Sequence, residues 1–94
     1  MSLRKLQRAV REERFEFTGH ALDEMDEDNL LIEDVLKAIL TGNIVAEMKD
    51  DPRGTRFVVC GTSEDTDCRI EVVCRFLPSG LMRIITVYCP EQEK

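Results

Sequence analysis

Histidine is the side chain best suited to acid–base chemistry near neutral pH, and this chain of 94 residues contains one. His20 is followed four residues later by Glu24, so both side chains lie on one face if the segment is helical. A carboxylate at that spacing could fix the tautomer of the imidazole, and His20 would then act as a general base. The alternative interpretation is structural, with His20 bonded to the local backbone at the start of a helix.

Cysteine offers a second kind of chemistry. No two of the four cysteines have the C-x-x-C spacing, so the zinc-ribbon and thioredoxin signatures are absent. All four lie in or beside apolar, strand-like runs, where cysteine behaves as a small hydrophobic residue. We therefore expect thiols that fill the core, and neither a metal nor a cofactor. A lesser alternative is a soft-metal site formed by three thiols on neighbouring strands, namely Cys60, Cys68 and Cys89.

Helical periodicity dominates the first half of the chain. Apolar residues recur at helical spacing over residues 3–13 and 19–28, and most clearly from Ile32 to Leu40. Thr18 is placed to cap the second of these helices, and Gly42 follows the third as its predicted C-terminal cap. Between the first two helices, the alternation Phe15-Glu16-Phe17 indicates a short extended piece.

Strand-like segments fill the second half. Residues 43–48, 55–61, 68–76 and 81–89 are rich in β-branched and aromatic residues and are separated by turn residues. Short gaps between successive strands favour an antiparallel meander. The expected fold class is α+β, with N-terminal helices packed on one face of a four-stranded antiparallel β-meander. We expect one domain over 1–94, which consists of an extra N-terminal helix (1–14), a helical part (15–42) and the meander (43–90).

The loop after Leu77 sets the predicted register of the last two strands. If Leu77 pairs with Gly80, one face of the sheet is almost wholly apolar and receives the helices. The pairs expected on that face are Cys68 with Cys89, Ile70 with Val87, Val72 with Ile85, Cys60 with Cys68, and Val58 with Ile70.

The opposite face is predicted to mix charged, aromatic and apolar side chains. One interpretation is an ordinary half-solvated sheet surface. The other is a shallow groove whose cations and phenol bind phosphate and base, above an apolar floor suited to stacking or to a partner. The pairs expected on this face are Arg69 with Tyr88, Glu71 with Thr86, Val73 with Ile84, and Arg75 with Met82.

Charge is unevenly distributed along the chain, whose formal net charge is −6. Residues 1–14 hold five basic and two acidic residues, residues 15–52 hold two basic and eleven acidic ones, and residues 53–94 hold six of each. This balance argues against non-specific nucleic-acid binding, although a local basic face could still grip RNA. No apolar run is long enough to span a membrane and no signal-peptide core is present, so we expect a cytoplasmic protein.

Several short motifs, in this order and spacing, resemble the bacterial family catalogued as domain of unknown function 4258. The resemblance covers about residues 15–90, which leaves the first helix as an addition. The motifs are Phe17-Thr18-Gly19-His20-Ala21, Met25, Leu30, Asp34-Val35, Ala38-Ile39, Gly42-Asn43-Ile44 and Ile84-Ile85-Thr86-Val87-Tyr88. The family is thought to be akin to the RelE-like and barnase/EndoU-like ribonuclease toxins, and some members are paired with antitoxin-like proteins.

The resemblance implies roles for individual residues. It places the family's histidine on His20 and its terminal hydroxyl residues on Thr86 and Tyr88. Metal-independent RNA cleavage also needs cations for the charge that develops on the phosphate. We assign Arg69 to this catalytic set, and the remaining expected RNA- or phosphate-binding residues are Arg56, Arg75 and Arg83.

Two departures from the family pattern shape the expected function. Glu24 and Asp28 stand where the family usually has arginine, so attraction for phosphate becomes repulsion at that helix. We therefore expect a toxin–antitoxin-like protein with a RelE-like fold that has lost catalysis and acts through an antitoxin-like partner or a homodimer. The alternative function is an active metal-independent endoribonuclease that uses His20 and Tyr88.

Overall fold

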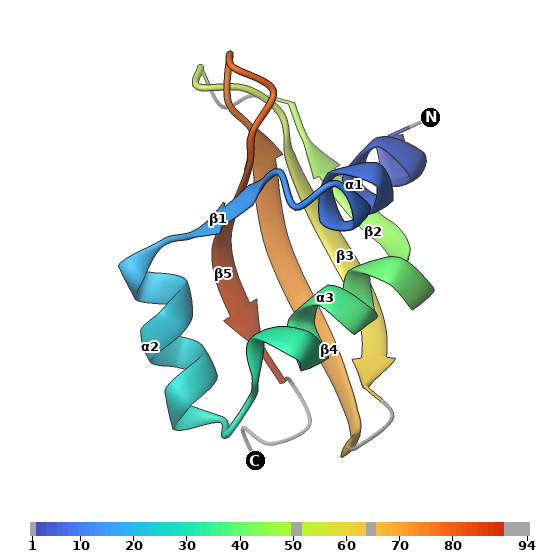
Figure 1. Cartoon of the computed structure of the whole chain (residues 1–94), viewed down its shortest axis with the longest axis vertical. Helices are drawn as coiled ribbons and strands as arrows, with labels where there is room; N and C mark the ends of the chain where they lie inside the picture. The colour runs from blue at the N-terminus through green and yellow to red at the C-terminus, as the bar shows by residue number, and fades with distance from the viewer. Residues whose placement is uncertain (1, 50–51, 64–65, 90–94) are drawn as a thin grey trace.

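Three helices and a five-stranded mixed sheet make up the structure, a computed structural model that describes residues 2–49, 52–63 and 66–89 (Figure 1). The α+β class is therefore confirmed. Within the described ranges, the longest helices have 10 residues and none is long and apolar enough to cross a membrane. The elements are α1 (Ser2–Arg11), β1 (Phe15–Phe17), α2 (Gly19–Glu27), α3 (Ile32–Thr41), β2 (Asn43–Met48), β3 (Arg56–Ser63), β4 (Thr66–Phe76) and β5 (Met82–Tyr88).

The sheet has one strand more than predicted. Its order is β1-β5-β4-β3-β2; β2 to β5 pair antiparallel in succession, whereas β1 pairs parallel with β5. The prediction of a purely antiparallel, four-stranded meander was therefore wrong. The extended piece Phe15–Phe17 joins the edge because its two aromatic rings pack against the core while Glu16 points to the other face.

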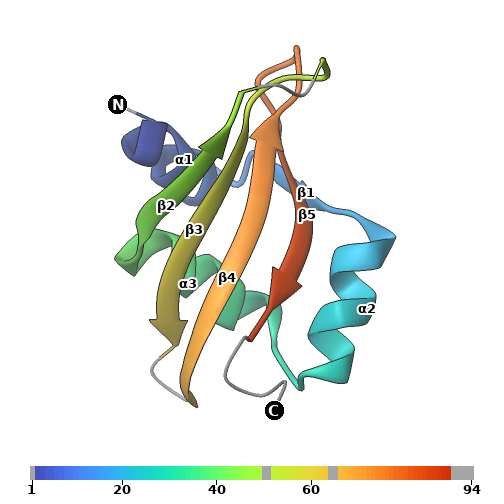
Figure 2. The same ribbon diagram turned by 180° about the vertical axis from the view of Figure 1, so that it is seen from behind.

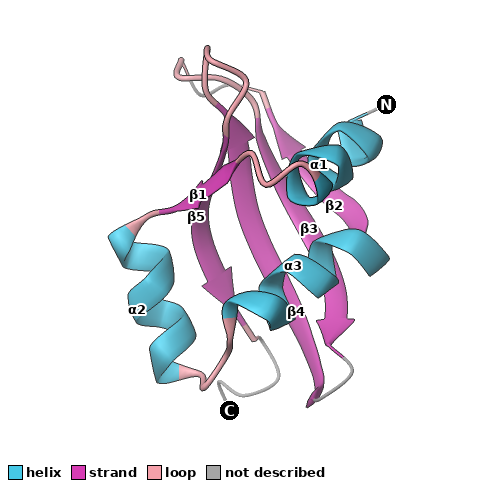
Figure 3. Cartoon of the chain, viewed as in Figure 1, coloured by secondary structure: helices cyan, strands magenta, loops and turns pink. Residues whose placement is uncertain are grey.

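The helices lie on one side of the sheet and leave the other side uncovered. Helices α1 and α3 cross one face, and α2 stands beside the outer edge of β5 (Figure 1). The view from behind shows strands with no helix over them (Figure 2). Figure 3 shows the same division into a helical layer and a sheet layer. The uncovered face of the sheet is thus the surface that the fold leaves available for binding.

Caps at the helix ends follow the sequence signals closely. Thr18 caps α2, since its Oγ1 accepts a hydrogen bond from the amide of Ala21 at 3.1 Å. In α3 the side chain of Asp34 accepts a hydrogen bond from the amide of Leu31 at 2.9 Å, which satisfies an amide at the start of the helix. Gly42 ends α3 as predicted, but its φ of −93° is not left-handed.

Two glycines allow α3 to approach β3 closely. A Cβ on Gly42 would lie 2.3 Å from the carbonyl oxygen of Cys60, and a Cβ on Gly61 would lie 2.2 Å from the carbonyl oxygen of Ala38. Both distances are far below van der Waals contact. Glycine is therefore needed at both positions for space rather than for backbone conformation.

The predicted register of β4 and β5 was wrong, and the loop explains why. Leu77 pairs with Leu81 rather than with Gly80, through a hydrogen bond of 2.8 Å from the Leu77 amide. The connection therefore contains three residues, with Gly80 at a φ of +92°. A bulge between Val73 and Cys74 shifts the pairing once more. As a result, Val72 lies opposite Val87, and Glu71 lies opposite Tyr88.

The register of β3 and β4 also differs from the prediction, since Val58 lies opposite Val73 rather than Ile70. On β3, Phe57 and Val59 face the helices, whereas the prediction placed Val58 and Cys60 there. On β5, Ile84 belongs to the core, although the prediction placed it on the uncovered face. Ile70, Val72 and Val87 are fully buried under the helices, as predicted.

Substituting Gly61 by alanine should destabilise the fold. The added methyl group would push α3 away from β3, and overpacking of this kind costs about 1–3 kcal/mol. For a domain of this size each kcal/mol lowers the melting temperature by roughly 4–8 °C. The measurement is thermal unfolding followed by circular dichroism.

Gly19→Ala is the matched control, since a Cβ on Gly19 would meet nothing within 4 Å. This residue is the first of α2, where alanine is the better helix former, so stability should be unchanged or slightly higher. Equal losses in the two variants would contradict the close approach of α3 to β3.

Candidate functional site

Three arginines on adjacent strands lie side by side on the uncovered face. Arg56 on β3 pairs in register with Arg75 on β4, and Arg75 pairs with Arg83 on β5. Adjacent strands are about 4.8 Å apart, so the three side chains start within roughly 10 Å of one another. We call these residues the arginine row. They are the three residues that the sequence singled out for phosphate binding.

At its β1 end the arginine row meets a carboxylate. Glu16 lies in register with Arg83, and its Oε2 accepts a hydrogen bond from Arg83 Nε at 2.6 Å. Both side chains are partly exposed, so this ion pair is worth at most about 1 kcal/mol. Glu16 carried no expected role, although its position between two core phenylalanines places it on this face.

Arg75 is the most buried member of the arginine row. Only 8% of it is exposed, and its Nε atom is buried without a hydrogen-bond partner. A buried donor without an acceptor costs free energy, and more so when it carries charge. Arg56 and Arg83 flank Arg75 on the neighbouring strands and carry the same charge. An anionic group of a ligand bound beside Arg75 would therefore be stabilised by positive charge.

An apolar patch adjoins the arginine row. Val58 and Val73 lie opposite each other on β3 and β4, and both are more than nine-tenths buried although no helix covers them. Thr86 on β5 lies opposite Val73 and continues this level of the sheet. The uncovered face therefore combines cations with an apolar centre.

Tyr88 lies beyond that patch, with its hydroxyl group engaged. It donates a hydrogen bond to Glu71 Oε1 on β4 at 2.6 Å. Arg69 is exposed on the same strand as Arg75, six residues away and therefore about 20 Å along the sheet. The predicted catalytic residue Arg69 is thus far from the arginine row.

His20 lies at the edge of the sheet rather than on its uncovered face. Its side chain is 69% exposed, and Nε2 lies 3.4 Å from Glu24 Oε2. The other carboxylate oxygen, Glu24 Oε1, accepts a hydrogen bond from the amide of Val87 at 3.0 Å. Because β1 ends at Phe17, this part of β5 has no neighbouring strand on that side, and Glu24 satisfies the open amide.

The predicted catalytic residues are therefore not assembled. The hydroxyl of Tyr88 is directed toward β4, whereas α2 with His20 stands on the other side of β5 (Figures 1 and 2). Glu24 accepts the hydrogen bond of the open Val87 amide, a structural role that the sequence alone did not reveal. Its only signal was its spacing of four residues from His20.

The three-thiol alignment predicted for a metal site does not occur among the residues described. Cys60 lies opposite Glu71 on the uncovered face, whereas Cys89 is fully buried in the core; the side chain of Cys68 lies outside the described part. Nor do the described residues contain any group of three His, Cys, Asp or Glu able to hold a metal ion. Burial raises the pKa of the Cys74 thiol to about 12.

Comparison with known proteins gives one match. A family model described as Domain of unknown function (DUF4258) matches residues 17–89, from the end of β1 to just beyond β5. No curated protein and no solved structure matches the chain. The match leaves α1 outside, as the sequence motifs implied.

Thiol labelling should distinguish the two faces of the sheet. Because burial raises the pKa of Cys74 to about 12, its thiol stays protonated at pH 8 and should resist alkylation by iodoacetamide until the protein unfolds. Cys60, which is partly exposed, should react in the native protein. Peptide mass mapping measures the extent of labelling at each cysteine separately. Rapid labelling of Cys74 in the native protein would contradict the assignment of Cys74 to the buried face.

Replacing Arg75 with methionine should make the protein more stable. Methionine fills a similar volume and removes a buried charge, a change that is often neutral or stabilising by about 1 kcal/mol or more. The expected rise in melting temperature is roughly 4–8 °C. Arg83→Met is the matched control, because it breaks the ion pair with Glu16 and should give no rise. Equal losses in both variants would show that Arg75 has a purely structural role.

Proposed function

We propose that this chain, which belongs to the family Domain of unknown function (DUF4258), is a non-catalytic binding module whose uncovered sheet face binds an acidic segment of a protein partner. The proposal includes a RelE-like, toxin-derived fold and an antitoxin-like partner. The arginine row is the anchor of this face, and the patch at Val58 and Val73 supplies the apolar contact.

The observation that carries the proposal is the unpartnered Nε of Arg75. A guanidinium group offers donors in a planar fork that matches a carboxylate, so an Asp or Glu of the partner would complete its hydrogen bonds. Arg56 and Arg83, which flank Arg75 on β3 and β5, would add to the attraction for that carboxylate. An arrangement that is unfavourable in the free protein would become favourable in the complex.

Charge favours an acidic protein segment over nucleic acid. The arginine row spans about 10 Å, enough for one or two anionic groups but short for a phosphate backbone. The chain carries a net charge of −6, and residues 15–52 hold eleven acidic and two basic residues, so a long polyanion would be repelled nearby. A symmetric dimer centred on the arginine row would place like charges against each other.

One observation supports an active endoribonuclease as the second candidate function. The arginine row could stabilise the charge that develops on a phosphate during cleavage. That function needs an acid and a base close to the same phosphate. His20 is paired with Glu24 beyond the edge of β5 and the hydroxyl of Tyr88 is bonded to Glu71, so neither group is directed toward the arginine row.

Binding can be tested with a defined probe. A fluorescent extended peptide with alternating glutamate and valine should bind the wild-type chain, with an affinity that falls as salt rises. Arg75→Gln should weaken binding at least tenfold. Arg69→Gln removes the same charge from the same strand and face but far from the arginine row, and should change the affinity less than twofold. Equal losses of affinity in the two variants would show that the peptide binds through diffuse charge attraction and not through the arginine row.

Ribonuclease activity is tested separately. Wild-type protein at high concentration should leave cellular RNA intact, and its expression should not arrest growth. If the wild-type protein degrades RNA and both His20→Ala and Tyr88→Phe abolish that activity, the binding-module proposal is wrong and the protein is an endoribonuclease. Single-stranded RNA with the same charge as the peptide is used as a competing ligand class in the binding assay. If RNA binds more tightly than the peptide, the proposal of an acidic protein segment is wrong.

A further inference from the structure

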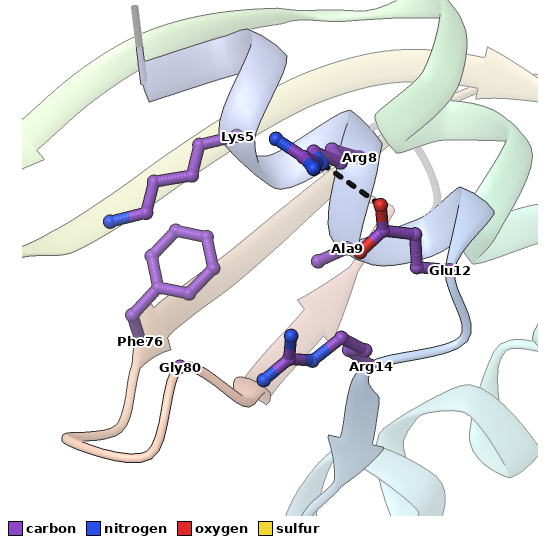
Figure 4. A pocket seen from close by; sticks show the side chains of 7 residues that line it. All are labelled: Lys5, Arg8, Ala9, Glu12, Arg14, Phe76 and Gly80. Atoms are coloured by element: carbon purple, nitrogen blue, oxygen red, sulfur yellow. Dashed lines mark hydrogen bonds and ion pairs between the residues drawn. The ribbon is translucent and has the colours of Figure 1, made fainter.

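A basic pocket lies between α1 and the β4–β5 hairpin, on the helical side of the sheet (Figure 4). Its volume is about 320 Å³, which is within the range of small-molecule sites. Phe76 lines it, and because Phe76 and Arg75 are consecutive on β4 they point to opposite faces. The sheet therefore separates this pocket from the arginine row.

Positive charge exceeds negative charge around the pocket. Lys5, Arg8 and Arg14 line it, and Glu12 is the one carboxylate among the lining residues that the structure describes. Glu12 Oε2 lies 2.9 Å from Arg8 Nε, and this hydrogen bond lowers the pKa of Glu12, as does the nearby charge of Arg14. Arg8 and Glu12 thus neutralise each other, which leaves Lys5 and Arg14 as surplus cations.

The pocket has an aromatic wall beside these cations. The ammonium group of Lys5 lies 4.7 Å from the centre of the Phe76 ring, and the ring packs edge-on against Phe57 with centroids 6.5 Å apart. Gly80 also lines the pocket, and a Cβ there would lie 3.3 Å from Arg14 Nη2. The guanidinium of Arg14 extends toward Gly80 in Figure 4, and its Nη2 donates a hydrogen bond to the carbonyl oxygen of Ser79 at 3.4 Å.

We propose that this pocket binds a small phosphate monoester with a planar apolar body. The phosphate lies between Lys5 and Arg14, which offer charge-assisted hydrogen bonds, and the planar body packs against Phe76. Aryl monophosphates and nucleoside monophosphates share this chemistry. Five of the pocket's seven lining residues precede residue 17, so the site depends on the helix that the family model does not cover. It is independent of the proposed partner-binding face.

The experiment titrates the full chain with phenyl phosphate, AMP and inorganic phosphate, followed by amide chemical shifts. Phenyl phosphate or AMP should bind at least tenfold more tightly than inorganic phosphate, with shifts in α1 and residues 76–80. Arg14→Gln should weaken binding at least tenfold. The matched control is Arg4→Gln, which removes the same charge from an exposed position of α1 outside the pocket and should change affinity less than twofold.

Two further variants test the aromatic wall and the independence of the pocket from the arginine row. Phe76→Leu should remove the preference for phenyl phosphate over inorganic phosphate. The ratio of the affinities for AMP and phenyl phosphate shows whether the pocket favours nucleoside monophosphates or aryl monophosphates. Arg75→Gln should leave all three affinities unchanged, so failure of the partner-binding face would not affect this result. Equal losses in Arg4→Gln and Arg14→Gln, or no preference for the ring-bearing ligands, would overturn the proposal.

Discussion

The contact between α3 and β3 fixes which face of the sheet is covered. At Gly42 and Gly61 the helix backbone and the strand backbone come closer than any side chain would allow. This contact directs Phe57 and Val59 toward the helices, and strand alternation then sends Arg56 and Val58 to the uncovered face. Everything proposed for that face depends on this one orientation.

The outer edge of β5 is satisfied in turn by β1, by Thr18 and by Glu24. Thr18 donates a hydrogen bond to the carbonyl of Ile85 and also caps α2, so it ties the start of the helix to the strand. Glu24 continues this edge at Val87. His20 is consequently held beside the edge of β5, where its neighbour Glu24 bonds the strand backbone. The same contacts that stabilise α2 keep the imidazole away from the arginine row.

Sequence alone was enough for the elements and their order. Period and caps located the three helices, because Thr18 and the acidic first turn of α3 satisfy amides that any helix start leaves open. Alternation located the strands, and the motifs from Phe17 to Tyr88 identified the family that the comparison confirms. The three arginines were singled out by residue type, but their alignment across three strands was not predicted. The extended piece Phe15–Phe17 was predicted, but its parallel pairing with β5 was not, because three residues carry too little pattern.

Tertiary structure decided which side chains share a face. A strand has a period of two, so the three-residue turn at Gly80 and the bulge at Val73 each reverse faces, and neither is encoded in apolar alternation. The amino-acid sequence by itself determined that helices precede strands and that arginines, one histidine and thiols are present. Only the packed chain placed three arginines abreast, buried Arg75 without an acceptor for its Nε, and separated His20 from Tyr88 by the width of β5, because those relations depend on contacts between residues distant in the chain.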